Sequence, residues 1–70
     1  ALVNIDLKEI QFNTIEFEVF KPTGQYLSIQ PKKTKDNQFQ FDFSSLTKGI
    51  YFIKFNINHG KLITKKILII

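Results

Sequence analysis

The sequence predicts an all-β fold, a small immunoglobulin-like antiparallel β-sandwich of about six or seven strands. Apolar and polar residues alternate with a period of two along most of the chain, whereas the 3.6-residue period of a helix is hard to find. Turn-forming residues separate the alternating stretches at close spacing. We expect residues 1–70 to form one domain, in which eight phenylalanines supply much of the core.

Two strands are predicted in the N-terminal part of the chain, over residues 2–7 and 14–19, and we expect them to be neighbours in one sheet. Between them, Ile10 and Phe12 form either a further short strand or a loop that packs inward. The alternation assigns these residues of the two strands to the core face: Val3, Ile5, Leu7, Ile15, Phe17 and Val19.

A hairpin is predicted to follow the second strand. Residues 22–25, Pro-Thr-Gly-Gln, form its turn, because proline presets φ at the first central position and glycine supplies the position with a permissive backbone. Residues 26–30 return as a strand with Leu27 and Ile29 on the core face. Pro31 ends this strand, because proline cannot donate to a sheet ladder.

The middle of the chain contains a predicted loop, a strand and a turn. Residues 32–37 are polar and rich in lysine, so we interpret them as the most mobile loop, solvated and without a binding role. Residues 38–44 show the clearest strand pattern, with three alternating phenylalanines facing inward. Residues 44–49 turn the chain, and Leu46 dips from this turn into the core.

The last third predicts a long hairpin. Residues 50–57 form a central strand that is covered on both sides near Phe52. Asn58-His59-Gly60 makes the turn, and residues 61–70 return as the closing strand. This strand carries Lys65-Lys66 at its middle. Lysines on a terminal strand protect an exposed sheet edge from pairing, which is the plainest interpretation of the two residues.

Composition excludes several classes of function. The net charge is +4, but every cation is lysine, and the absence of arginine argues against recognition of nucleic acid. With no cysteine and one histidine, the chain offers neither a disulfide nor a zinc site, and we expect no cofactor. The terminal apolar run over residues 67–70 is far shorter than the ~20 residues of a membrane-spanning helix, so we expect no membrane insertion.

The sequence lacks a recognisable catalytic constellation, and we expect no enzyme activity. His59 falls in a predicted exposed turn with no serine or acid at obvious reach. Glu16 and Glu18 lie on one strand face roughly 7 Å apart, which suits glycosidases but also describes any solvated strand face. The three glycines are spread along the chain, so no phosphate-binding loop is present.

Three aromatic residues fall outside the predicted core. Phe20, Tyr26 and Phe52 are expected to form a small exposed patch, which favours docking to another domain over a ligand site. The chain begins at Ala1 without a methionine and without the regions of a signal peptide, so we expect it to be excised from a longer secreted protein.

Four segments occur in an order that resembles a known family. Residues 17–25 are a strand and a turn with glycine. Residues 41–54 are a strand ending in an acid, a leucine, and a glycine-aromatic strand start. Residues 60–61 make a glycine hairpin, and residues 65–67, Lys-Lys-Ile, belong to a lysine-rich closing strand. This order resembles the C-terminal sorting domain, type A, of the type IX (Por) secretion system of Bacteroidetes. One departure is that residues 1–7 lack the proline-asparagine-proline segment common in that family.

The resemblance implies a secretion signal that carries a covalently linked upstream cargo through the periplasm to the cell surface or the exterior. Its implied partners are the type IX translocon, which it binds while crossing the outer membrane, and a signal-removing peptidase. The residues that the resemblance assigns to translocon recognition are Gly49, Tyr51, Gly60, Lys65, Lys66 and Ile67. Tyr51 is expected to point inward. The surface that a partner can reach is therefore expected to be the Gly60 turn and the outward-facing residues of 61–70.

The alternative is an accessory immunoglobulin-like module of a surface protein that spaces domains, docks them or binds carbohydrate. A sorting domain ends its open reading frame, whereas an accessory module does not have to. The position of the stop codon in the parent gene therefore separates the two.

Overall fold

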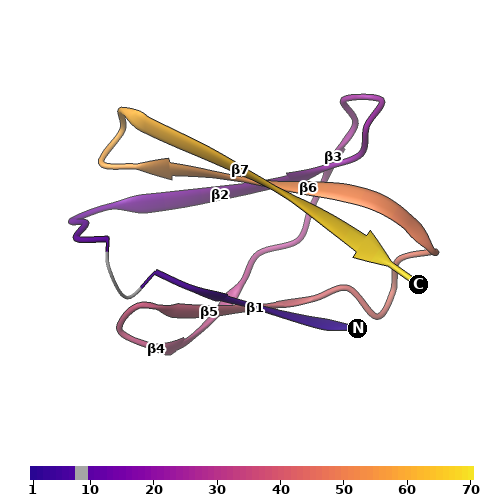
Figure 1. The fold of residues 1–70 in the computed structure, drawn as a ribbon, viewed down its shortest axis with the longest axis horizontal. Helices are drawn as coiled ribbons and strands as arrows, with labels where there is room; N and C mark the ends of the chain where they lie inside the picture. The colour runs from indigo at the N-terminus through magenta and orange to yellow at the C-terminus, as the bar shows by residue number, and fades with distance from the viewer. Residues whose placement is uncertain (8–9) are drawn as a thin grey trace.

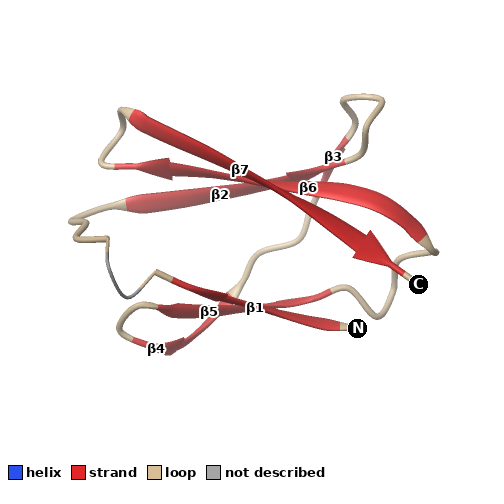
Figure 2. Cartoon of the chain, viewed as in Figure 1, coloured by secondary structure: helices blue, strands red, loops and turns tan. Residues whose placement is uncertain are grey.

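The chain folds into two antiparallel β-sheets packed face to face (Figure 1). The computed structural model describes residues 1–7 and 10–70, and every regular element in them is a strand (Figure 2). The strands are β1 (Leu2–Asp6), β2 (Ile15–Phe20), β3 (Tyr26–Leu27), β4 (Lys32–Lys35), β5 (Gln38–Asp42), β6 (Gly49–Ile57) and β7 (Lys61–Ile69). One sheet has the order β1-β5-β4 and the other β3-β2-β6-β7. The predicted small β-sandwich is confirmed.

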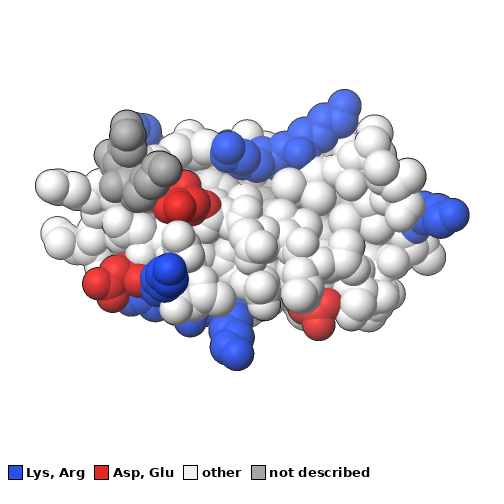
Figure 3. All heavy atoms as spheres, turned by 60° about the horizontal axis from the view of Figure 1, so that its bottom comes forward, with Lys and Arg blue, Asp and Glu red and all other residues white. Residues whose placement is uncertain are grey.

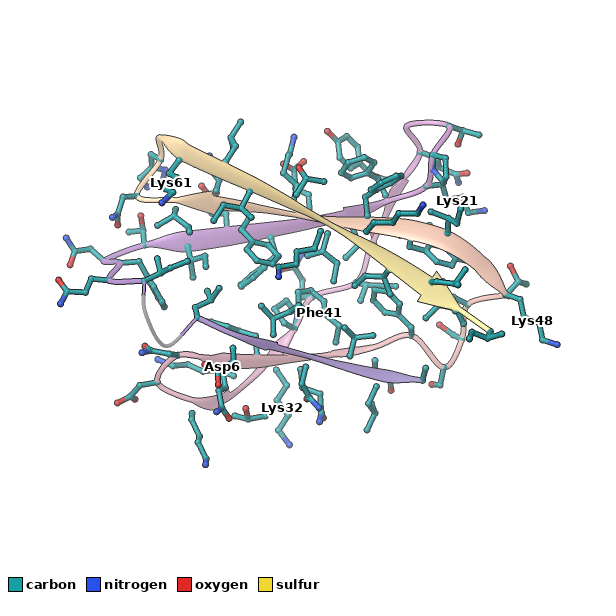
Figure 4. All side chains as sticks on the ribbon, in the orientation of Figure 1. Asp6, Lys21, Lys32, Phe41, Lys48 and Lys61 are labelled. Carbon is teal, nitrogen blue, oxygen red and sulfur yellow. The ribbon has the colours of Figure 1, made fainter. Side chains whose placement is uncertain are left out.

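The core between the sheets is built by the alternating residues that the sequence assigned to it. Phe17 packs its ring against Phe39, Phe41 and Phe55 at centroid distances of 4.8, 5.3 and 5.4 Å. Phe41 lies between the sheets in Figure 4 and is fully buried. Burial of each such side chain contributes about 1.5–3 kcal/mol. The buried set is Ile5, Leu7, Phe17, Val19, Phe39, Phe41, Phe43, Tyr51, Ile53, Phe55, Ile57 and Ile69.

The first two strands are in different sheets, so their predicted pairing is wrong. β1 pairs with β5, with Leu2 opposite Asp42, while β2 pairs with β3 and β6. The alternation of apolar residues fixes which face of each strand is buried, but it carries no information about the neighbouring strand. In a sandwich, the apolar faces of two strands reach the same core whether the strands lie in one sheet or in different sheets.

The segment predicted as the most mobile loop contains a strand. All four residues of β4 are exposed, and its three lysines pair with β5, with a register shift between Lys33 and Lys35. Backbone hydrogen bonds to β5 hold this strand in the sheet. Because none of its side chains is buried, its sequence shows no hydrophobic alternation. β3 is also shorter than predicted and ends at Leu27, although Leu27 and Ile29 do pack against the core.

The predicted turns are confirmed. Gly24 has φ 93°, and the Lys21 N–H donates to the Gln25 C=O at 2.9 Å, which closes the first hairpin. Ile10 and Phe12 lie in a loop and pack against the core, as one of the two predicted options has it. Leu46 packs against the core from the turn before β6, as predicted.

Candidate functional site

The β6–β7 hairpin, which carries all the residues assigned to recognition, spans the length of the sandwich. Its strands pair over nine positions, from Gly49 opposite Ile69 to Ile57 opposite Lys61. At about 3.3 Å per residue the hairpin is roughly 30 Å long. β6 is central, as predicted, and β7 forms the edge of its sheet. We call the turn at residues 58–60 the hairpin tip, and the opposite end at residues 49–51 and 67–69 the hairpin base.

Asn58 and His59 bend the chain at the hairpin tip. Their φ values are 53° and 58°, in the left-handed region that asparagine tolerates better than most residues. Gly60 lies outside that region, and a Cβ on it would meet only the Asn58 carbonyl oxygen, at 3.9 Å. Gly60 therefore does not set the shape of the turn, because the positive φ angles lie at the two residues before it.

Asn58 also ties the tip to the segment that enters β2. Its side-chain oxygen accepts the backbone N–H groups of Asn13 at 2.8 Å and Thr14 at 3.2 Å, and its own N–H donates to the Thr14 carbonyl at 2.9 Å. These bonds join residues more than forty positions apart in the chain. Sequence reasoning missed this contact, although asparagine at a turn is a signal for left-handed backbone.

His59 has an acid within reach, contrary to the sequence prediction. Its Nδ1 lies 3.2 Å from Oε1 of Glu16, and both side chains are mostly exposed. The next acid along β2, Glu18, lies 3.4 Å from Lys54 Nζ. Each carboxylate that the sequence offered as half of a catalytic pair thus faces a nitrogen-bearing side chain, His59 or Lys54, on the neighbouring hairpin. These contacts organise the outer face of the sheet.

The hairpin base is held by buried groups. Tyr51 is 3% exposed, and its hydroxyl donates to the Thr47 carbonyl at 2.7 Å, which fixes the turn that leads into β6. Gly49 has φ 149°, a conformation that residues with a side chain rarely adopt. The prediction that Tyr51 points inward is confirmed, and Gly49 meets a backbone requirement at the start of β6.

Asp42 shapes the same turn from its other side. One of its carboxylate oxygens accepts the Ser44 backbone N–H at 2.9 Å. Hydrogen bonds from the Ser44 side chain and backbone lower the pKa of Asp42 below its ordinary value, because they favour the charged carboxylate. The acid at the end of the fifth strand therefore stabilises the turn that positions Gly49.

The structure places the predicted recognition residues at the hairpin base, at the middle of β7 and at the hairpin tip. Tyr51 and Ile67 are directly opposite each other at the base, next to Gly49, whereas Gly60 lies at the tip. Figure 4 shows Lys48 and Lys61, which flank base and tip, at opposite ends of the molecule. The predicted residues thus form no single cluster.

Lys65 and Lys66 lie halfway along β7 on opposite faces of the sheet. Lys65 is opposite buried Ile53 and shares the core-facing side with half-buried Ile67, yet it reaches the surface at the rim. Lys66 is opposite Phe52 on the outer side. Both lysines are exposed. A partner that contacts both must therefore reach around the sheet edge.

The predicted aromatic patch is confirmed on the outer face of the four-stranded sheet. Phe20 stacks on Phe52 at 5.6 Å and meets Tyr26 edge to face at 5.9 Å. Lys54 Nζ lies 6.0 Å from the centre of the Phe20 ring. Tyr26 is 61% exposed, while the two phenylalanines cover part of each other. The cover predicted near Phe52 consists of these neighbouring rings.

Open clefts lie on the surface of the described residues. One of them lies at the hairpin base between the β2–β3 turn and the start of β6, and its lining includes Lys21, Lys48 and Tyr51. In residues 1–7 and 10–70, no group of three or more histidine or acidic side chains could hold a metal ion. On the face shown in Figure 3, charged side chains lie around a wide uncharged centre. Nor does the described part of the chain contain a helix long and apolar enough to cross a membrane.

Comparison with protein families gives a match over the full sequence. The model of the family described as secretion system C-terminal sorting domain matches residues 1–70. The chain has no significant match among curated proteins or among solved structures.

Proposed function

This chain belongs to the family of secretion system C-terminal sorting domains, and from that premise we propose that it directs an upstream cargo across the outer membrane by binding the type IX translocon. Membership gives the chain a role as a C-terminal secretion signal of the type IX system, with export to the cell surface or the exterior. Binding to the translocon, transit through the periplasm and later removal by a peptidase are parts of the proposal.

The single observation that carries this function is the family match over the whole chain. The geometry supports it, because the hairpin has a long exposed strand and the clefts of the described residues are open. A signal of this kind works by being bound, and it needs a stable fold with an accessible surface.

Within the hairpin, we propose a division between residues that present the surface and residues that a partner touches. Tyr51 is buried and Gly49 has a restricted backbone, so both act by shaping the hairpin base. Lys65 and Lys66 are exposed and available to a partner. Ile67 is half-buried at the hairpin base and packs β7, which carries the two lysines, against the core.

The test fuses residues 1–70 behind a periplasmic reporter in a type IX host and compares it with a fusion that lacks residues 65–70. We expect the full fusion to be secreted and the shortened one to stay in the cell. A matched control replaces Lys32, Lys33 and Lys35 of β4 by threonine, which removes charge from the other sheet. Secretion of the shortened fusion at the full level would contradict the proposed function.

The aromatic patch supports a second candidate, an accessory docking module. Phe20, Tyr26 and Phe52 would then be the contact surface. Carbohydrate binding is less favoured, because Phe20 and Phe52 stack on each other and a sugar needs a free ring face. Replacing Phe20 and Tyr26 by threonine separates the candidates, since the docking module loses its contact while the sorting domain keeps secretion. The stop codon in the parent gene gives an independent answer.

A further inference from the structure

We propose that the free edge of β7 is a binding site for an extended strand of a partner protein that carries carboxylates opposite Lys65 and Lys66. The inference rests on the proposed function and specifies it, because it states how the translocon would contact the hairpin. The partner strand would add to the four-stranded sheet as a fifth strand, bound by backbone hydrogen bonds and selected by charge.

A comparison of the sheet edges singles out β7. Proteins protect edge strands from pairing by making them short, by interrupting them with bulges or by placing charges on them. β3 has two residues, and β4 has four exposed residues with a register shift. β1 has five residues. β7 has nine, contains no proline or glycine, and pairs with β6 without a register shift. It is the longest regular edge among the described strands.

Two bonds at the hairpin tip show which backbone groups of β7 are free. The Gly60 N–H donates to the Ile57 carbonyl at 3.1 Å, so Ile57 directs its backbone groups toward β7, whereas the Asn58 N–H donates to Thr14 on the β2 side. Backbone groups of an antiparallel strand alternate between its two neighbours. From the register of β6 and β7, the residues whose N–H and C=O groups face the free edge are Leu62, Thr64, Lys66 and Leu68.

The side chains along this edge offer apolar contact on both faces of an added strand. Leu62 and Leu68 are 61% and 62% exposed on the outer side. Ile63 and Ile67 are half-buried on the core side and border the edge. A partner strand with apolar side chains on both of its faces at these positions would cover both pairs, which gives the site a pattern of specificity beyond its backbone bonds.

Lys65 and Lys66 determine the chemistry of the partner. In the described part of the chain neither has an ion pair, and they point to opposite faces at the middle of the edge. Two copies of β7 paired antiparallel about this point would bring lysines against lysines, which is unfavourable. A strand with Asp or Glu at two adjacent positions would place one carboxylate on each face, next to each lysine. The charge therefore favours an acidic partner strand over a second copy.

The first experiment removes one free N–H without removing a bond inside the domain. In the reporter fusion, Thr64→Pro deletes the N–H that faces the free edge, and Thr64→Val keeps the N–H with a side chain of similar shape. We expect Thr64→Pro to lower secretion about tenfold or more and Thr64→Val to leave it unchanged. Both variants should have nearly the same unfolding temperature as the natural domain, because proline is tolerated where a strand's N–H faces solvent. If Thr64→Pro lowers the unfolding temperature, Leu62→Pro replaces it.

The second experiment tests the charge. Lys65→Glu combined with Lys66→Glu should lower secretion as strongly as Thr64→Pro, while Lys32→Glu combined with Lys33→Glu on β4 should not. Replacing both β7 lysines by threonine should increase dimer formation, measured by sedimentation. If the natural domain itself forms a dimer that Thr64→Pro abolishes, the edge binds a second copy and the inference is overturned.

Failure of this inference is distinguishable from failure of the proposed function. Normal secretion without residues 65–70 contradicts the function. Blocked secretion in that deletion, together with normal secretion of a folded Thr64→Pro variant, contradicts strand addition alone.

Discussion

The two ends of the β6–β7 hairpin are fixed by different kinds of interaction. At the base, Tyr51 is buried and bonded to the Thr47 carbonyl, and Gly49 has a backbone angle that needs glycine. At the tip, Asn58 bonds to an exposed loop and His59 meets Glu16 at the surface. Packing holds the base, where substitutions will act through stability. Polar contacts hold the tip, where substitutions will shift the turn while the core stays intact.

The largest loss of stability is expected when the side chain of Tyr51 at the hairpin base is truncated. Tyr51→Ala removes a buried aromatic ring, which costs about 3–5 kcal/mol, close to the whole stability of ~3–5 kcal/mol available to a domain of this size. We expect this variant to be largely unfolded by circular dichroism at 25 °C. Tyr51→Phe removes the hydroxyl group and its hydrogen bonding with Thr47 and should lose about 1 kcal/mol. A folded Tyr51→Ala domain would show that the base does not depend on packing.

The two glycines of the hairpin provide the next test. Gly49→Ala forces a side chain into φ 149° and should lose about 1–3 kcal/mol. Gly60→Ala, at a position with open space and an ordinary backbone angle, should change the stability by less than about 0.5 kcal/mol. Urea unfolding of both variants measures the difference. Equal losses would contradict the conclusion that, of the two glycines, only Gly49 has a backbone angle that requires glycine.

Asn58 is the corresponding test at the tip. Asn58→Gly keeps the left-handed turn but removes the side-chain oxygen that accepts two N–H groups, so we expect a loss of about 1–2 kcal/mol. Asn58→Ala should lose more, because it adds backbone strain. In both variants amide hydrogen exchange should rise at Asn13 and Thr14 and stay slow at Ile53. Faster exchange at Ile53 would mean that the tip and the core unfold together.

The smallest expected effect is a pH dependence at the base. Because hydrogen bonds from Ser44 lower the pKa of folded Asp42, this carboxylate stabilises the fold above its unfolded pKa of about 3.9 and loses that contribution as the pH falls through the lower folded value. Asp42→Asn should therefore be slightly less stable than the natural domain at pH 7, and this difference in the free energy of unfolding should disappear below pH ~3. Urea midpoints at several pH values measure it. A gap that widens toward low pH would reverse the assigned direction.

Strand faces were predictable from this sequence, but strand neighbours were not. Alternation placed Phe17, Phe41 and Tyr51 in the core, because burial of one face leaves a period of two in the sequence. It could not show that β1 pairs with β5 or that the exposed β4 is a strand, since pairing is decided by the backbone and by distant segments. Turn chemistry correctly gave the bend at Gly24.

For the candidate site, the sequence supplied a set of residues that stays a prediction, and the structure added their geometry. The order of motifs pointed to the final hairpin, and the family match confirms the family that this order resembles. Period-two alternation already implies that Lys65 and Lys66 occupy opposite faces, although the pair reads as a single charged feature in the sequence. The contacts of Asn58 and His59 with residues before and within β2 depend on the sheet register, which no local pattern contains.

The pairing of β1 with β5 has a consequence for the order in which the domain folds. Leu2 lies opposite Asp42, so this pairing closes a loop of about forty residues, whereas β6 and β7 are joined by a three-residue turn. Closing long loops slows folding, and all-β domains with such contacts fold in about milliseconds to seconds. We expect the terminal hairpin to form early and the three-stranded sheet to close over it last. A chain held open before that closure would already present β7.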